Sequence, residues 1–256
     1  MRPSAAPGRR VQLHRAVSKL GWGSRTQAWA WIHAGEVCVE GRVVTDPLTW
    51  VDLDRQQITR GGLAAPAVAH QTLALHKPRG VITTRRDERG RRTVYDLLPP
   101  GLPWIFPAGR LDADSEGLLI LTTDAALAVR LTEPEQHVPK TYHVTVTGRP
   151  TPEGLRRLRE GVELDDGMTR PAAVRVLRTD GDATTLEVIL TEGRNRQLRR
   201  MLRVVGHRVR RLLRVAIGRY KLGDLPAGRT RELQEVEVLL LAQDQSGRSP
   251  RSHRPA

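Results

Sequence analysis

Cysteine, aromatic residues and lysine are all scarce in this chain of 256 residues. Its single cysteine, Cys38, excludes an internal disulfide and a cysteine-rich metal site, and it fits a reducing compartment. No apolar run approaches the roughly 18 residues that a membrane span needs. The basic N-terminus lacks the apolar segment of a secretory signal. We therefore expect a cytoplasmic protein that has no membrane partner.

Several enzyme signatures are also missing. The chain contains no P-loop, no complete dinucleotide fingerprint, no nucleophile elbow and no His-Glu-x-x-His zinc motif. The eight histidines are scattered, and no pair has the helical spacing of metal ligands. The sequence therefore gives no indication of a metal site or of a small-molecule cofactor.

Positive charge is the most informative excess. There are 42 lysines and arginines against 28 acidic residues, which gives a net charge of +14 and an isoelectric point near 11.2. Arginine dominates, since Lys19, Lys77, Lys140 and Lys221 are the only lysines. A surface with such an excess attracts polyanions, so the composition predicts a nucleic-acid-binding protein.

Composition predicts two tails and a linker that separate two folded regions. Residues 1–10 and 244–256 are polar, basic and rich in Pro, Ser and Gly, which is typical of disordered tails. Residues 59–71 contain small residues, Gly and Pro without a period, as in a linker. Between them, residues 11–58 predict a small domain, and residues 72–243 a large one.

The small domain has the pattern of two short helices followed by a hairpin. Apolar residues recur at helical spacing from Leu13 to Leu20, and Ser24 with Gln27 has the pattern of a capping box at the second helix. Residues 37–44 then read as a strand, a tight turn and a second strand.

The large domain mixes strands and helices without a regular alternation. We expect strands at 72–76, 81–84, 118–123, 141–147, 174–178 and 184–190, and helices at 124–131, 152–161 and 195–205. This order disfavours a doubly wound parallel sheet. It predicts an α+β fold with a mixed, mainly antiparallel sheet and flanking helices.

A polar loop at residues 109–117 is the first candidate site. It carries three carboxylates, Asp112, Asp114 and Glu116, directly before an apolar strand. A tight polar loop at the entrance of a strand suits an active site, and a plain surface turn is the alternative. The spacing does not choose among the three carboxylates.

Two further segments carry candidate side chains. Tyr142 begins an alternating strand beside Lys140, so it is either a core tyrosine or a platform for a nucleobase. The predicted helix 195–205 has an apolar stripe and a second stripe of arginines. Three interpretations of these arginines are open. They form a solvated face of the helix, some of them hold RNA phosphates, or one of them pairs with a buried aspartate.

Taken in order, these segments resemble the motifs of the RsuA-type pseudouridine synthases, which modify ribosomal RNA. The similar segments are 76–80 (HKPRG), 109–118 (GRLDADSEGL), 140–142 (KTY), 192–201 (EGRNRQLRRM), 213–218 (LRVAIG) and 225–233 (LPAGRTREL). Residues 11–58 resemble the RNA-binding domain named after small-subunit ribosomal protein S-four. The resemblance implies a pseudouridine synthase fold with an S-four-like domain at its N-terminus.

The resemblance also implies a mechanism. Asp112 would attack the target nucleotide or remove a ribose proton, so that uracil detaches at N1, turns and rejoins through C5 without a metal or cofactor. Tyr142 would stack on the flipped uracil, and Arg199 would pair with Asp112 to keep it ionised. Arg110 would fill the gap that the extruded base leaves.

Basic residues are expected to hold the RNA phosphates against the cost of base flipping. The candidates are Arg15, Lys19, Arg25, Lys77, Arg85, Arg86, Arg89, Arg91, Arg92, Arg194 and Arg196. For the arginines at 85–92, a solvated surface loop is the alternative. The expected partner is ribosomal RNA or a ribosomal assembly intermediate. Large-subunit RNA is favoured because the run from Asn195 to Gln197 resembles its enzymes, and a monomer is the default state.

Two other functions stay open at this point. The chain could be a non-catalytic ribosome-assembly factor that kept the fold and the binding surface, although an intact set of Asp112, Tyr142 and Arg199 argues against this. It could also be a DNA-binding regulator that uses its first 55 residues as a helix-turn-helix. The predicted hairpin after Gly35 disfavours that alternative.

Overall fold

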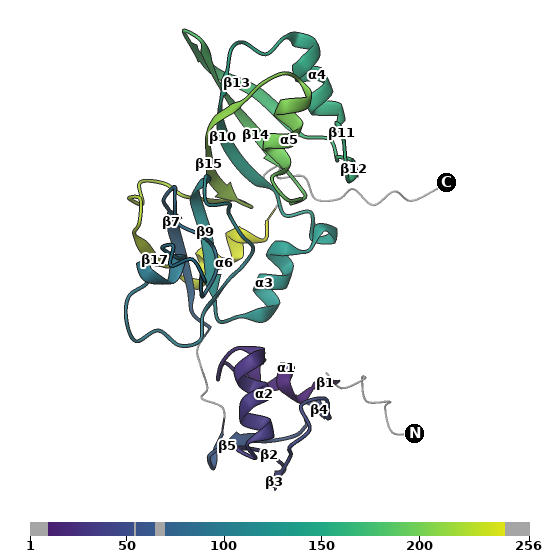
Figure 1. Cartoon of the computed structure of the whole chain (residues 1–256), viewed down its shortest axis with the longest axis vertical. Helices are drawn as coiled ribbons and strands as arrows, with labels where there is room; N and C mark the ends of the chain where they lie inside the picture. The colour runs from purple at the N-terminus through teal and green to yellow at the C-terminus, as the bar shows by residue number, and fades with distance from the viewer. Residues whose placement is uncertain (1–9, 54, 65–69, 244–256) are drawn as a thin grey trace, which may run out of the picture. The chain divides into compact units, whose positions relative to one another are not determined.

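The computed structural model describes residues 10–53, 55–64 and 70–243, which form two compact units (Figure 1). The first unit contains the described residues up to Gln71 together with 100–106 and 123–125, and the second contains the rest. The predicted tails lie outside the described residues, apart from Arg10, which begins the first strand.

The first unit packs two helices against short strands. The helices are α1 (Leu13–Lys19) and α2 (Arg25–His33), and Ser24 and Gln27 form the predicted capping box. Strand β1 (Arg10–Gln12) pairs with β4 (Trp50–Asp52), and a second sheet has the order β3 (Arg42–Val43), β2 (Val37–Val39), β5 (Ile58–Arg60) and β6 (Leu63–Ala64). Leu13, Val17 and Ile32 form a fully buried core between the two helices.

The predicted linker begins too early. Residues 58–64 form a hairpin of β5 and β6, and β5 pairs with β2, so they belong to the sheet of the first unit. Gly61 and Gly62 make the turn with φ angles of 57° and 76°, a conformation that glycine adopts without strain. The sequence shows two adjacent glycines, and these fit a tight turn as well as a linker.

A nine-stranded mixed sheet forms the second unit, and it confirms the predicted α+β fold. Its path runs β13-β14-β10-β15-β9-β7-β17, and β8 and β16 pair with β9 and β15. Among the described strands on this path, β9 and β15 pair in parallel and all other neighbours pair antiparallel. The strands are β7 (Thr72–Lys77), β8 (Phe106–Pro107), β9 (Glu116–Thr122), β10 (Lys140–Thr147), β13 (Ala173–Asp180), β14 (Ala183–Leu190), β15 (Val209–Ile217), β16 (Tyr220–Lys221) and β17 (Thr230–Glu232).

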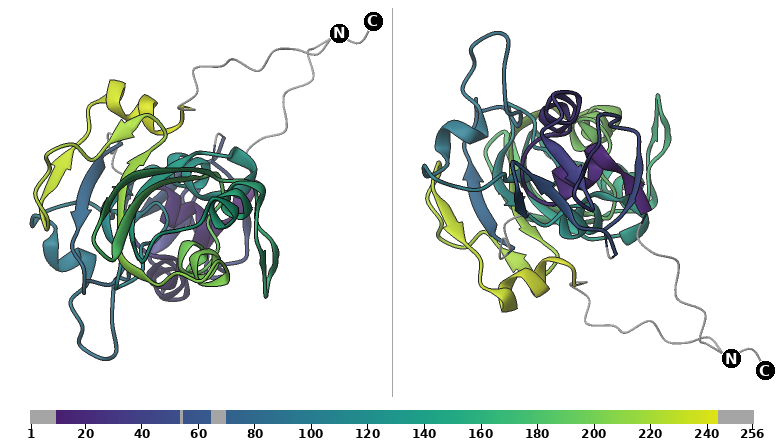
Figure 2. Two further views of the ribbon diagram at one scale, coloured as in Figure 1. Left: turned by 90° about the horizontal axis from the view of Figure 1, so that it is seen from above. Right: turned by 90° about the horizontal axis from the view of Figure 1, so that it is seen from below.

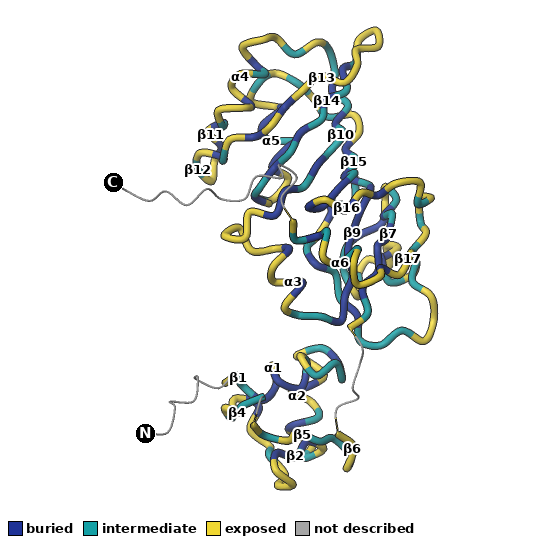
Figure 3. Tube along the Cα trace, turned by 180° about the vertical axis from the view of Figure 1, so that it is seen from behind, coloured by how far each residue is buried: buried dark blue, intermediate teal, exposed yellow. Residues whose placement is uncertain are grey.

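Two hydrophobic clusters cover this sheet. Helices α4 (Pro152–Glu160) and α5 (Gln197–Val204) pack beside β10, β13 and β14, as Figure 1 and Figure 2 show. Helices α3 (Ala125–Thr132) and α6 (Glu235–Leu241) pack near β7 and β9. Figure 3 shows the central strands as the most continuously buried part of the chain. Strand β15 contributes to both clusters, through Leu212 and Ile217, so it joins the two halves of the unit.

Smaller elements complete the second unit. They are the hairpin of β11 (Glu163–Leu164) and β12 (Gly167–Met168) and two short 3₁₀ helices, η1 (Val94–Leu97) and η2 (Pro134–Gln136). The predicted strand at 81–84 is wrong, because this segment makes a single isolated bridge between Ile82 and Thr93. None of the helices in the described residues has the length and apolar character that a bilayer crossing requires.

Candidate active site

The loop that carries Asp112 is fixed by the segment that follows β7. The Gly80 amide donates to the Ala113 carbonyl at 2.7 Å. The Thr83 hydroxyl donates to the Leu111 carbonyl at 2.8 Å, and the Leu111 amide lies 3.3 Å from the same hydroxyl. These contacts hold the backbone on both sides of Asp112, as a preorganised catalytic group requires.

Gly117 brings the Asp112 loop against strand β15. Its φ is 109°, and a Cβ atom there would overlap the backbone nitrogen and carbonyl of Arg214. Glycine alone permits this approach, because it has no Cβ and tolerates positive φ. The parallel register pairs Gly117 with Arg214, so the loop and the Arg214 side chain meet at one point of the sheet.

Lys77 lies behind the loop and has no exposed surface. Its ammonium group donates to the carbonyls of Pro78 at 3.0 Å and Val81 at 2.6 Å. The prediction that Lys77 contacts RNA is therefore wrong, since a fully buried ammonium cannot reach a phosphate. Burial lowers the pKa of Lys77 from 10.5 to about 8, against the opposing effect of nearby carboxylates such as Asp112.

The depressed pKa of Lys77 predicts a stability change with pH. Between about pH 8 and pH 10.5 the unfolded chain binds a proton at Lys77 that the folded chain has released, so stability rises with pH. We expect this lysine to contribute up to about 3 kcal/mol across that window. Urea unfolding should show the free energy of unfolding rising in wild type relative to Lys77→Met. Lys221→Met, at an exposed lysine, should follow wild type, and a Lys77→Met curve parallel to wild type would contradict the prediction.

Arg196 is the ion-pair partner of Asp112. Its Nη1 lies 3.9 Å from Asp112 Oδ2, and its guanidinium also donates to both carboxylate oxygens of Asp114, at 3.1 and 2.7 Å. Arg199, the partner expected from the resemblance, binds Asp114 instead. Its Nη2 donates to the Asp114 carbonyl at 2.9 Å, and its Nε lies 3.3 Å from Asp114 Oδ2. Among the described residues, Arg196 therefore makes the direct ion pair that was predicted for Arg199, while Arg199 lies close enough for the charge of Asp112 to act on it.

Local backbone geometry explains this exchange. Arg196 has a left-handed conformation with φ of 47° and precedes α5, which begins at Gln197 rather than at the predicted 195. Arg196 is thus not part of the regular helical stripe that contains Arg199. Burial raises the pKa of Asp114, but hydrogen bonds from Arg196 and the charge of Arg199 outweigh it and lower the pKa overall. Asp114 is consequently held as an anion that fixes two arginines beside Asp112.

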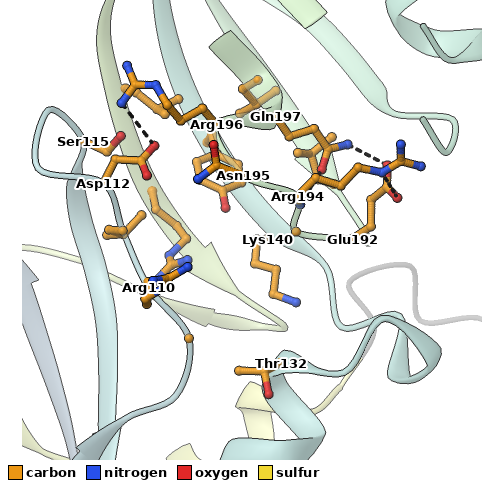
Figure 4. Close-up of a pocket in the computed structure, with 18 of the residues that line it drawn as sticks. Arg110, Asp112, Ser115, Thr132, Lys140, Glu192, Arg194, Asn195, Arg196 and Gln197 are labelled. Atoms are coloured by element: carbon orange, nitrogen blue, oxygen red, sulfur yellow. Dashed lines mark hydrogen bonds and ion pairs between the residues drawn. The ribbon is translucent and has the colours of Figure 1, made fainter. Parts of the chain in front are cut away.

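Asp112 and Tyr142 line a single cavity of about 310 Å³. Figure 4 shows Asp112 in this cavity. Tyr142 is half-buried on β10 and packs against the hydrophobic cluster under α5, while it also lines the cavity. Its two interpretations from sequence are thus compatible, because the ring is anchored in the core and still reaches the cavity. The volume is at the small end of the range for ligand pockets, which suits a single nucleotide.

The other predicted RNA contacts differ in how free they are. Arg110 is exposed at the cavity. Arg194 is half-buried and its guanidinium is occupied, since it donates to Glu192 and to the carbonyls of Asp166, Gly167 and Met168. Arg194 therefore braces the β11–β12 hairpin.

The remaining candidates lie on exposed segments. Arg85 lies over the ring of Tyr95, with 4.8 Å between guanidinium carbon and ring centre, and Arg91 pairs with Asp87. Six further candidates are exposed to solvent, namely Arg15, Lys19, Arg25, Arg86, Arg89 and Arg92.

Sequence reasoning missed Lys140 and Arg214 as functional residues. Both line the cavity with Asp112. Two signals were available, since Lys140 alternates with Tyr142 on one strand face, and Arg214 interrupts the apolar run of residues 212–217. No group of three or more His, Cys, Asp or Glu side chains in the described ranges could hold a metal ion.

Comparison with known proteins shows what the chain is similar to. The sequence profile of the family described as RNA pseudouridylate synthase matches residues 71–203. A Bacillus subtilis relative named ribosomal large subunit pseudouridine synthase B is 39% identical over 229 residues, which cover 89% of this chain and 93% of the relative. An Aquifex aeolicus relative named uncharacterized RNA pseudouridine synthase is 37% identical over 232 residues, 90% of this chain and 93% of the relative. A crystal structure of a pseudouridylate synthase matches with a TM-score of 0.66 and 28% identity, over 90% of this chain and 99% of that one.

Proposed function

Because this chain belongs to the RNA pseudouridylate synthase family, an isomerase family, we propose that its substrate is a chosen uridine of ribosomal RNA. Large-subunit RNA is the favoured substrate, since the Bacillus subtilis relative carries that activity in its name. The net charge of +14 supports a polyanionic partner.

One observation carries the proposed mechanism: Asp112 and Tyr142 line the same cavity, and Arg196 lies 3.9 Å from the Asp112 carboxylate. The target uridine leaves its stack and enters this cavity, as enzymes that act on a base require. Asp112 then attacks C1′ or removes the C2′ proton. Tyr142 stacks on the uracil ring, and Arg196 orients the Asp112 carboxylate through the ion pair between them. Arg110, exposed at the cavity, occupies the place that the flipped base leaves.

Exposed basic residues supply the phosphate contacts in this proposal. In the second unit these are Arg85, Arg86, Arg89, Arg91 and Arg92, on the charged loop at 85–92. In the first unit they are Arg15, Lys19 and Arg25, which supports an S-four-like RNA-binding role for that unit. Lys77 is not included because it is fully buried, and Arg194 is not included because its donors are already bound to the protein. A cytoplasmic location, a monomeric state and activity without a cofactor stay predictions.

The proposal is tested by mapping pseudouridine in ribosomal RNA. Carbodiimide treatment followed by primer extension should show one or more sites that disappear when the gene is deleted and return with the wild-type gene. We expect the missing sites in large-subunit RNA, and a site in small-subunit RNA would overturn that preference. Unchanged ribosomal RNA in the deletion strain would overturn the proposed substrate.

A further inference from the structure

The cavity has more positive charge than its own carboxylates can neutralise. Five cationic side chains and two carboxylates line it, namely Arg110, Lys140, Arg194, Arg196 and Arg214 with Asp112 and Glu192. Arg196 pairs with Asp112 and Asp114, and Arg194 pairs with Glu192 and Asp166. Within the described part of the chain, Arg110, Lys140 and Arg214 form no ion pair. A site of this kind is suited to a ligand group that bears negative charge.

Arg214 is the most unusual of these three cations, because only 5% of its surface is exposed. Its Nε donates to the Leu118 carbonyl at 2.7 Å. Its Nη2 is buried and has no hydrogen-bond partner among the described residues. A buried guanidinium with an unused donor is unfavourable in the free protein. Such a donor is explained when a ligand supplies the acceptor.

Lys140 lies in the same cavity and is also largely withdrawn from solvent. Burial, followed by the charge of Arg214, lowers the pKa of Lys140 from 10.5 to about 8. Figure 4 shows the Lys140 side chain in the cavity, with no interaction to the residues drawn around it. Two cations that repel each other thus share a cavity, and an acceptor placed between them would relieve both.

Strand register puts these two cations beside Tyr142. Tyr142 on β10 is directly paired with Arg214 on β15, and directly paired residues of antiparallel strands project from the same face. Lys140 precedes Tyr142 by two residues on β10, so it shares that face as well. A base stacked on Tyr142 would therefore have Lys140 and Arg214 near its edge.

We propose that Lys140 and Arg214 donate hydrogen bonds to the carbonyl oxygens of the target uracil and stabilise the negative charge that this base carries while it is detached. The inference rests on the proposed function. The base is favoured over a phosphate because the phosphates of a flipped nucleotide stay continuous with the strand outside, while its base reaches deepest into the protein. Arg214 lies on the buried sheet at the cavity wall, so in this proposal the base contacts it and the phosphates do not.

The chemistry of the reaction creates the required charge. When the C1′–N1 bond breaks, both electrons stay on N1, and resonance spreads the negative charge over N1, O2 and O4. C1′ meanwhile bonds to a carboxylate oxygen of Asp112, or becomes doubly bonded to C2′ after Asp112 takes the C2′ proton.

The second half of the reaction joins C5 of the base to C1′. In the first route the Asp112 oxygen leaves C1′, and in the second the C2′ proton returns from Asp112. In both routes C5 then loses its proton and N1 gains one. Donors at O2 and O4 bind the detached base more strongly than the intact nucleoside, so they accelerate the reaction rather than merely hold the substrate.

The test compares two leaving groups in an RNA fragment that carries the mapped target, with uridine or 5-fluorouridine at that position. Fluorine withdraws electrons and stabilises the detached ring by itself. For uridine, Lys140→Met and Arg214→Met should each lower the single-turnover rate by about 10²- to 10³-fold. For 5-fluorouridine, measured as loss of the starting nucleotide, the penalty should be about tenfold smaller, with RNA affinity within about threefold of wild type. Lys221→Met, at an exposed lysine outside the cavity, should match wild type.

Each other outcome has a distinct meaning. Equal penalties for both nucleotides would overturn the inference and leave the two residues with a positioning role. A loss confined to RNA affinity, with a shallower salt dependence, would show phosphate contacts and also overturn it. If Arg214→Met does not fold, Arg214→Lys and Lys140→Met give the same comparison. An inactive wild-type protein would overturn the proposed function itself, whereas equal penalties in an active enzyme overturn only this inference.

Discussion

Asp112→Asn is expected to lower the rate of pseudouridine formation by at least about 10⁴-fold, with RNA affinity within about threefold of wild type. The amide has nearly the shape of the carboxylate, but it can neither attack C1′ nor take a proton from C2′. The neighbouring contacts are made by the backbone of Leu111 and Ala113, so the loop should keep its place. The measurement is carbodiimide mapping of target RNA after single-turnover incubation with each protein.

Asp114→Asn is the matched control, because Asp114 lies in the same loop and contacts the same arginine. Its carboxylate is already occupied by Arg196 and Arg199, so we expect a positioning effect of about 10- to 100-fold. A larger loss of rate in Asp114→Asn than in Asp112→Asn would mean that Asp114, and not Asp112, is the catalytic carboxylate. If Asp112→Asn formed the same pseudouridines as fast as wild type, Asp112 would not be the catalytic carboxylate. If neither protein formed any, the assembly-factor alternative would gain support.

Local patterns predicted local structure well. The Ser24–Gln27 capping box starts α2 as expected. The apolar stripe of the predicted helix 195–205 is buried in α5 through Leu198, Met201 and Leu202. Alternation likewise located β10, where Tyr142 lies between core and cavity. In each case the signal is a spacing within one element, and neighbouring elements did not override it.

Tertiary packing decided what the sequence could not show. Lysine is usually an exposed residue, but the fold buries Lys77 completely and leaves its ammonium group bonded to the carbonyls of Pro78 and Val81. The choice between Arg196 and Arg199 depends on one left-handed residue before α5, which shifts the start of the helix by two positions. Arg214 enters the cavity because Gly117 allows β9 to approach β15. The spacing of apolar residues along a helix or strand does not predict any of these three features.

The left-handed residue also sets up a comparison between the two arginines. Arg196→Gln removes the ion pair to Asp112 and two hydrogen bonds to Asp114, and we expect the single-turnover rate to fall by about 10³-fold with little change in RNA affinity. Arg199→Gln keeps the pair between Arg196 and Asp112. We expect about a tenfold lower rate there, through looser anchoring of the Asp114 backbone.

Arg203→Gln is the control on the same helix, because Arg203 is exposed and forms no ion pair within the described ranges. Its rate should equal that of wild type, with at most a lower RNA affinity and a shallower salt dependence. The opposite order, in which Arg199→Gln is the more damaging variant, would mean that Asp112 exchanges Arg196 for Arg199 when RNA binds. The pairing of Asp112 in the free protein would then not be the catalytically active one, and the preorganised site inferred from it would be wrong.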